Sequence, residues 1–225
     1  GTAGALQLSE SLFNGRQDLE KLDLSYCGLT SHYAVKLNSD FPLAGCVTDL
    51  NLEGNPIMQE GGDAIASLLA NPQCSMKALA LNKCQLGLGG VLGIMQAVAV
   101  NNSLEEIHLV ENFNLKKHGL NATETSDCSQ LEVADSEDES MKEEASFEGW
   151  KFVEELSAAI GNAKVLRLVD LSNNGLSIQV AETLYGAWCW DGRAGLSQKH
   201  IGENILQFSV KGVECCKPRA CCPKH

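Results

Sequence analysis

One pattern of apolar positions recurs along the chain. An apolar residue is followed at the fourth and sixth positions by two more apolar residues, and at the ninth position by Asn or Cys. The pattern begins at Leu19, Val47, Met76, Leu104 and Leu166, and the first four starts are 28, 29 and 28 residues apart. Because apolar and polar residues alternate at its centre, each copy predicts a short strand with one buried side.

A motif of this kind at a period of roughly 20–29 residues is typical of leucine-rich repeats, in which each repeat contributes one strand. A single repeat cannot bury its apolar side alone, so the repeats must stack and share one continuous core. The sequence therefore predicts a solenoid with one curved, open strand surface. That surface is where a partner would bind.

Segments with helical spacing follow the strands. In residues 59–70, for example, Ala64, Ile65, Leu68 and Leu69 share one helix face. We predict further helices at 31–38, 88–100, 177–187 and from Trp150, and strands near 20–24, 48–52, 77–81, 105–109, 167–171 and, in divergent form, 206–210. The expected fold class is an α/β leucine-rich-repeat solenoid, or horseshoe, with parallel strands on the concave face and helices on the convex face.

The repeat spacing is interrupted once, because 62 residues separate Leu104 from Leu166. The extra material at about 115–147 is polar, and between Asn121 and Glu148 ten acidic residues face one lysine. This composition is typical of disorder. We therefore expect a solenoid over residues 1–211 with an acidic, disordered insertion at 115–147. Most of the chain's net charge of −12 lies in that insertion.

Two of the ten cysteines occupy a repeat position. Cys27 and Cys84 stand at the ninth motif position, where other repeats have Asn. Asn at this turn hydrogen-bonds unpaired backbone groups, and Cys does so more weakly while packing as a small apolar residue. Buried thiols of this kind favour an intracellular, reducing compartment.

The last residues, 212–225, form a cysteine-rich tail. Cys215, Cys216, Cys221, Cys222 and His225 lie within eleven residues. Thiolates are zinc ligands, and a tetrahedral site needs four. The Cys-x-x-Cys spacing is absent, however, so the tail favours flexible or packed thiols, and we predict no bound metal. Zinc remains the alternative.

No catalytic motif is present. The five histidines lack metalloprotease spacing, and neither a Gly-x-Ser-x-Gly elbow nor a dinucleotide fingerprint occurs. We therefore expect a protein that is not an enzyme and needs no cofactor. No apolar run is long enough to cross a membrane. The first repeat lacks its strand, which suggests a C-terminal piece of a longer repeat protein.

The residues between the apolar positions are expected to face the concave side and to bind the partner. The predicted partner-binding residues are Lys21, Asp23, Tyr26, Asp49, Asn51, Glu53, Asn82, Glu106, His108, Glu111 and Asp170. Carboxylates dominate this set, so the surface should attract a basic segment of a protein and repel nucleic acid. Tyr26 would serve as an aromatic anchor beside Asp49.

The 28/29 period with alternating Asn and Cys resembles the ribonuclease-inhibitor family of repeats. Residues 183–222, with TLYGAWCW, GRAGLSQKHIGENILQFSVKG and paired cysteines, resemble the C-terminal leucine-rich-repeat region of the plant Tonsoku (Brushy) family. Two more stretches, LDLSYCGLTSHYAVKLN and LNLEGNPIMQEGGDAIASLL, carry the same resemblance. It implies a nuclear protein of replication-coupled DNA repair and chromatin maintenance. The histone-reading tetratricopeptide repeats of that family are absent from this chain.

The main hypothesis is thus a protein-interaction module of a nuclear genome-maintenance protein. Two alternatives use the same concave surface, a ribonuclease-inhibitor-like enzyme inhibitor and the recognition domain of an immune receptor. A tetratricopeptide array upstream would favour the first reading. A free-standing repeat protein would favour an inhibitor, and a nucleotide-binding module or signal peptide would favour a receptor.

Overall fold

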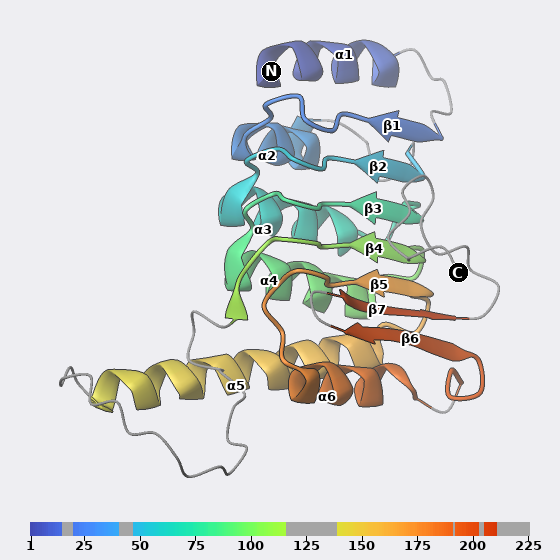
Figure 1. Cartoon of the computed structure of the whole chain (residues 1–225). Helices are drawn as coiled ribbons and strands as arrows, with labels where there is room; N and C mark the ends of the chain where they lie inside the picture. Colours follow the sequence, from blue (N-terminus) through green and yellow to red (C-terminus); the bar gives the residue numbers. More distant parts are fainter. Residues whose placement is uncertain (15–19, 41–46, 116–138, 191, 203–204, 211–225) are drawn as a thin grey trace, which may run out of the picture.

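Strands and helices alternate along the chain. A computed structural model describes residues 1–14, 20–40, 47–115, 139–190, 192–202 and 205–210 (Figure 1). The helices are α1 (Thr2–Asn14), α2 (Ser31–Asp40), α3 (Met58–Leu69), α4 (Gly87–Val100), α5 (Glu139–Asn162) and α6 (Ile178–Trp188). The strands are β1 (Lys21–Asp23), β2 (Asp49–Asn51), β3 (Ala78–Ala80), β4 (Glu106–His108), β5 (Leu168–Asp170), β6 (Ser197–Gly202) and β7 (Ile205–Val210).

The described strands form one sheet in the order β1-β2-β3-β4-β5-β7-β6. Strands β1 to β5 are parallel, and each pairs with the strand of the next repeat. The central residues lie in one straight row: Leu22, Leu50, Leu79, Ile107 and Val169. The helices stack in a second column beside the strands (Figure 1). The predicted α/β leucine-rich-repeat solenoid and the register of its first five strands are confirmed.

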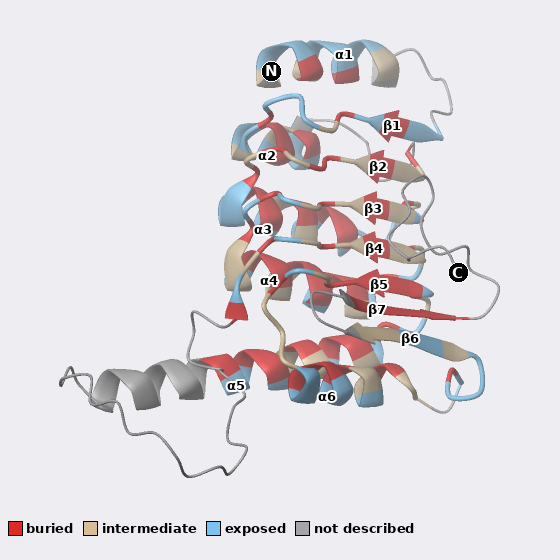
Figure 2. Ribbon diagram, in the orientation of Figure 1, coloured by how far each residue is buried: buried red, intermediate tan, exposed pale blue. Residues whose placement is uncertain are grey.

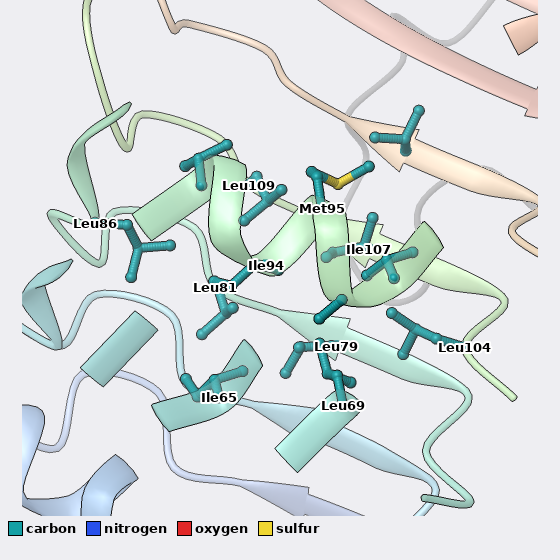
Figure 3. Close-up of a cluster of buried hydrophobic side chains, with 14 of the residues drawn as sticks. Ile65, Leu69, Leu79, Leu81, Leu86, Ile94, Met95, Leu104, Ile107 and Leu109 are labelled. Carbon is teal, nitrogen blue, oxygen red and sulfur yellow. The ribbon is translucent and has the colours of Figure 1, made fainter. Parts of the chain in front are cut away.

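The core fills the space between the strand column and the helix column. All five residues of the central row are buried, at 7% exposure or less. Figure 2 shows the same division, with buried residues on the facing sides of strands and helices. In Figure 3, Leu79 and Ile107 from the strands meet Ile94 and Met95 from α4. Each helix packs on the next one, and the buried residues of strands and helices form one continuous core.

Buried asparagines join successive repeats at the turn after each strand. Asn55 Nδ2 donates to the carbonyls of Leu24 and Leu52, and its Oδ1 accepts from the Leu29 amide. Asn112 and Asn174, two and three motif copies later, likewise donate to a carbonyl of the preceding repeat and accept from one of its amides. Each amide thereby satisfies backbone groups of two repeats that the tight turn leaves without strand partners. We call this series the asparagine ladder.

The two cysteines at the ladder position behave differently. Cys84 is buried, and its thiol lies 3.2 Å from the Leu52 carbonyl of the preceding repeat. Burial raises the pKa of Cys84 to about 12, so its thiol stays protonated and can donate at neutral pH. Cys27 lies in the turn after the first described strand, is exposed, and contacts the carbonyl of Ser25 at 3.5 Å. Of these two cysteines, Cys84 makes the predicted hydrogen bond between repeats, whereas the contact of Cys27 stays within its own turn.

The sheet ends in an antiparallel hairpin. The divergent strand expected near 206–210 is β7, but it runs antiparallel to β5. Strand β6, which pairs with β7, was not predicted. Phe208 continues the apolar row beyond Val169 and stacks on Trp188, with ring centroids 6.3 Å apart. The hairpin caps the end of the apolar core, as terminal units of solenoids must.

A buried arginine completes this cap. The Arg193 guanidinium lies 3.9 Å from the centre of the Trp188 ring and donates to the Ala163 carbonyl. Burial lowers the pKa of Arg193 to about 10. The aromatic face and the carbonyl compensate part of the cost of burying the charge.

The expected acidic insertion and the expected cysteine-rich tail lie partly or wholly outside the described residues. Helix α5 begins at Glu139, so residues 139–147 belong to a helix and not to the disordered insertion expected over 115–147. Leu115, at the expected start of the insertion, is buried. Residues 116–138 and the cysteine-rich tail at 212–225 lie outside the described residues.

The asparagine ladder should contribute strongly to stability. We expect Asn112→Ala to lower the free energy of unfolding by roughly 2–4 kcal/mol, because buried backbone groups lose partners at about 1–3 kcal/mol each. Asn112→Cys should cost less, since a thiol at this position can donate, as in Cys84. Urea unfolding measures both. Asn102→Ala, at an exposed asparagine of the same region, is the control, and equal stability of the three variants would contradict the role of the ladder.

Thiol reactivity should follow burial. Iodoacetamide at neutral pH should alkylate Cys27 in the folded chain and leave Cys84 unmodified, because the reactive thiolate is suppressed by the raised pKa of Cys84. Peptide mapping by mass spectrometry compares the two sites. Both should react in urea. Equal rates in the folded state would show that the ladder position is open to solvent.

Candidate interaction surface

A groove of about 600 Å³ runs across the open face of strands β1 to β4. Its walls come from residues of four successive repeats, which the parallel register brings together in rows. Six of the predicted partner-binding residues line it: Lys21, Asp23, Asp49, Asn51, Glu106 and His108. We call it the concave groove.

Charged side chains in the groove are only partly neutralised by one another. Lys21 Nζ lies 4.0 Å from Asp49 Oδ2, and both side chains are well exposed, so this ion pair is weak. Asp23 accepts hydrogen bonds from the Ser25 amide and from Asn51 Nδ2. The groove has four carboxylates and two lysines among its lining residues, so it is acidic overall: Asp23, Asp49, Glu105 and Glu106 against Lys21 and Lys77.

The centre of the groove is low and apolar. Strand β3 places Ala78 and Ala80 on the open face, where β2 has Asp49 and Asn51 and β4 has Glu106 and His108 in the same rows. Both alanines are partly exposed. Because a methyl group is much shorter than the flanking side chains, β3 forms a notch between two taller strands.

Two groove residues, Lys77 and Glu105, were missed by the sequence analysis. Each directly precedes a strand, so strict alternation would place it on the core side. The amides of Lys77 and Ala78 both donate to the Thr48 carbonyl, and those of Glu105 and Glu106 both donate to the Lys77 carbonyl. Two residues of one strand thus lie opposite a single residue of the neighbouring strand, as in a β-bulge. The alternation of side chains between the core and the open face is broken at these positions. No residue type in the motif signals this bulge.

Four further predicted residues lie in the turns beyond the strands. Tyr26, Glu53, Asn82 and Glu111 form a rim at the ends of β1 to β4. The Tyr26 hydroxyl donates to Glu53 Oε1 at 2.7 Å, and Asn82 Nδ2 donates to Glu53 Oε2 at 3.1 Å. Tyr26 remains 60% exposed, so its ring is held in place and yet available to a partner. Tyr26 was expected to lie beside Asp49. It lies instead beside Glu53 and Gly54.

The rim turn requires a left-handed backbone in every repeat. The residue before the ladder position has a positive φ in all five described copies, namely Tyr26, Gly54, Lys83, Glu111 and Asn173. Only one of these is glycine, and left-handed conformations cost non-glycine residues roughly 1–2 kcal/mol. At Gly54 the missing side chain has a second use, because a Cβ there would lie 2.3 Å from the Tyr26 ring. Tyr26 therefore packs directly on the Gly54 backbone.

Two predicted residues are not available to a partner, which corrects the sequence analysis. Glu53 is only 5% exposed and Asp170 only 1%. Glu53 is enclosed by the hydrogen bonds of the rim. Asp170 lies in β5, where all three residues are buried, and it accepts from the Ser172 amide and hydroxyl. Alternation identifies the face on which a strand residue lies but not how far that face is buried, and this explains the difference at Asp170.

Metal-ligating side chains are not clustered in the part of the chain that the structure describes. Within residues 1–14, 20–40, 47–115, 139–190, 192–202 and 205–210, no three His, Cys, Asp or Glu side chains are grouped as a metal site. His108 Nδ1 lies 3.9 Å from Asp170 Oδ2, and the enclosed Asp170 also accepts from the Ser172 hydroxyl. No described helix is both long enough and apolar enough to span a membrane.

Comparison with known proteins supports the repeat architecture. The Leucine Rich repeat family matches residues 46–66, which include β2 and most of α3. The chain is 31% identical over 112 residues to the Ribonuclease inhibitor of Sus scrofa, which covers 50% of this chain and 25% of that protein. The chain is therefore an α/β leucine-rich-repeat solenoid with relatives of the ribonuclease-inhibitor type.

Other relatives are larger proteins whose names state that they contain NACHT and PYD domains besides leucine-rich repeats. The chain is 32% identical over 109 residues to NACHT, LRR and PYD domains-containing protein 14 of Mus musculus, or 48% of this chain and 11% of that protein. It is 25% identical over 216 residues to NACHT, LRR and PYD domains-containing protein 5 of Homo sapiens, or 95% of this chain and 17% of that protein. The chain thus spans a quarter or less of the length of these relatives.

Filling the space above Gly54 should disturb the rim. Gly54→Ala adds a methyl group against the Tyr26 ring at a residue with φ of 72°, so both packing and backbone are strained. Gly28→Ala is the matched control, since Gly28 has φ of 64° and open space around it. We expect Gly28→Ala to cost about 1 kcal/mol from the backbone alone, and Gly54→Ala at least twice as much. Urea unfolding measures both, and equal losses would contradict the packing of Tyr26 on Gly54.

Proposed function

We propose that this chain is a protein-interaction module that binds a basic segment of a partner protein in the concave groove. The observation that carries the proposal is the groove itself, open across four parallel strands and lined by four carboxylates and two lysines. The same excess of carboxylates disfavours direct binding of nucleic acid. Neither catalysis nor a cofactor is required for this role.

The rigid strand surface suits this role. The groove residues are fixed by the parallel register and by a buried core, so few of them lose conformational freedom on binding. Carboxylates from adjacent repeats add their fields, which accelerates the approach of a positively charged partner. Tyr26, held on Gly54 and bonded to Glu53, offers an aromatic contact at the rim.

The biological setting is a further part of the proposal. The resemblance of residues 183–222 to the plant Tonsoku family supports a nuclear protein of replication-coupled repair and chromatin maintenance. An intracellular, reducing location agrees with the buried thiol of Cys84. A soluble protein partner, rather than a membrane, is expected.

A ribonuclease-inhibitor-like function is the second candidate. It is favoured by the 31% identity to the Sus scrofa Ribonuclease inhibitor, which extends over half of this chain. The relatives with NACHT and PYD domains favour instead a recognition domain within a larger receptor. All three readings place the partner on the same groove and differ in what the partner is.

Charge reversal tests the groove directly. The variant Asp23→Lys, Asp49→Lys, Glu106→Lys changes three groove carboxylates and spares the buried Glu53. Binding of a fluorescein-labelled oligoarginine peptide, measured by anisotropy over a range of ionic strengths, should weaken at least tenfold, which is about 1.4 kcal/mol. The dependence of affinity on salt should also become shallower, because fewer charge contacts are screened.

The control reverses three exposed acids on the helices: Glu10→Lys, Asp63→Lys, Glu154→Lys. This control changes the net charge by the same amount. Because its three residues do not line the concave groove, it should retain most of the affinity and of the salt dependence. If the two triple variants lose affinity equally, the peptide responds to net charge and the concave groove is not the binding site.

A further inference from the structure

The notch on β3 has a shape that the rest of the groove lacks. At the row where β1, β2 and β4 carry Lys21, Asp49 and Glu106, β3 carries Ala78. Ala80 repeats the gap one row further on, between Asn51 and His108. Two methyl groups side by side therefore form a short apolar floor that is bounded by polar side chains of both neighbouring strands.

The two rows differ in charge. The Ala78 row has a carboxylate on each side, Asp49 on β2 and Glu106 on β4. Neighbouring strands lie about 4.8 Å apart, so these backbones are roughly 10 Å apart with the alanine between them. Beside Ala80 the two neighbouring strands have an amide and an imidazole instead, and the carboxylates of that row, Asp23 and Asp170, lie one strand further away. A cation would therefore be stabilised over Ala78 in preference to Ala80.

We propose that the notch is the specificity pocket for one Arg or Lys side chain of the partner. Its aliphatic stem lies along the methyl groups of Ala78 and Ala80, and its charged head lies between Asp49 and Glu106. Long basic side chains combine an apolar stem with a charged end, which is the combination that this floor and its walls match. This inference rests on the proposed function and adds to it the residue that the groove selects.

Asp49 already pairs with an ammonium group. Lys21 Nζ lies 4.0 Å from Asp49 Oδ2, and the Lys21 side chain is 75% exposed, so this lysine can move away at little cost. Thr48 Oγ1 lies 3.0 Å from the same carboxylate oxygen and 2.7 Å from the Glu20 carbonyl, so its one proton is shared between these two acceptors. Lys21 acts in the empty groove as a competitor that an incoming basic side chain displaces from Asp49.

The fold itself indicates that the notch can be filled without loss of structure. Leu168 of β5 lies in the same row as Ala78, one strand beyond Glu106. A leucine at this position is thus compatible with the parallel strand and its register. Ala78→Leu should therefore fill the notch and keep the sheet intact, without any change of charge.

The test uses the full chain and a glycine-serine peptide with a single central arginine. Titrations are followed by the amide NMR signals of the protein. We expect the signals of Ala78, Ala80 and their neighbours on β2 and β4 to shift in a saturable way. A peptide with citrulline in place of arginine keeps the shape but lacks the charge, and it should bind roughly tenfold more weakly or worse.

Three variants separate the notch from general electrostatics. Ala78→Leu should abolish the shifts, whereas Ala158→Leu, the same change at an exposed site on α5, should leave them unchanged. Lys21→Gln should tighten binding because Asp49 loses its competitor. Lys151→Gln, an equal change of charge at an exposed residue of α5, should have a smaller effect.

The outcomes distinguish the notch from the groove as a whole. If oligoarginine binding depends on the groove carboxylates but Ala78→Leu does not affect the single-arginine peptide, the proposed function stands and the notch is not a pocket. Equal effects of Lys21→Gln and Lys151→Gln, or equal binding of the citrulline peptide, would likewise overturn the pocket. Failure of oligoarginine itself to bind would overturn the proposed function. A folded Ala78→Leu variant, checked by circular dichroism, is required in each comparison.

Discussion

Stacking of incomplete units is the constraint on which this structure depends. A strand of three residues with one buried side chain has no independent stability, and neither has the short helix that covers it. Each strand is stabilised by pairing with the strand of the next repeat, which places equivalent residues side by side, as in the row Leu22, Leu50, Leu79. The near-constant spacing of 28 or 29 residues keeps those positions in register. The buried asparagines then join the turns, which have no sheet partners of their own.

The same constraint creates the surface where a partner would bind. Because every apolar position of a strand is used by the core, the remaining positions are left on the open side and can vary in sequence without changing the fold. Here they vary from aspartate and glutamate to alanine, and the result is an acidic groove with a low apolar centre. Rigidity comes from the stacked core, while specificity comes from residues that the core does not use. This separation explains how similar solenoids can bind different partners.

The ends of the solenoid show what happens where stacking stops. At β5 the next parallel strand is replaced by an antiparallel hairpin, and Phe208 and Trp188 cover the last apolar row. Arg193 lies buried against Trp188, which places a polar group at the boundary of the core. All three residues of β5 are buried, and the residues that line the concave groove come from β1 to β4 and the positions beside them.

The repeat pattern in the sequence was sufficient to determine the fold class, the positions of the first five strands, and the buried central residue of each. These features follow from local periodicity, and periodicity is visible without a structure. Two kinds of feature depended on tertiary structure. The β-bulge before each strand added Lys77 and Glu105 to the groove, because it arises from hydrogen bonds between repeats. Burial of Glu53 and Asp170 also depended on tertiary structure: Tyr26 of the preceding repeat hydrogen-bonds Glu53, and Asp170 lies in a strand whose three residues are all buried. No pattern within a single repeat contains that information.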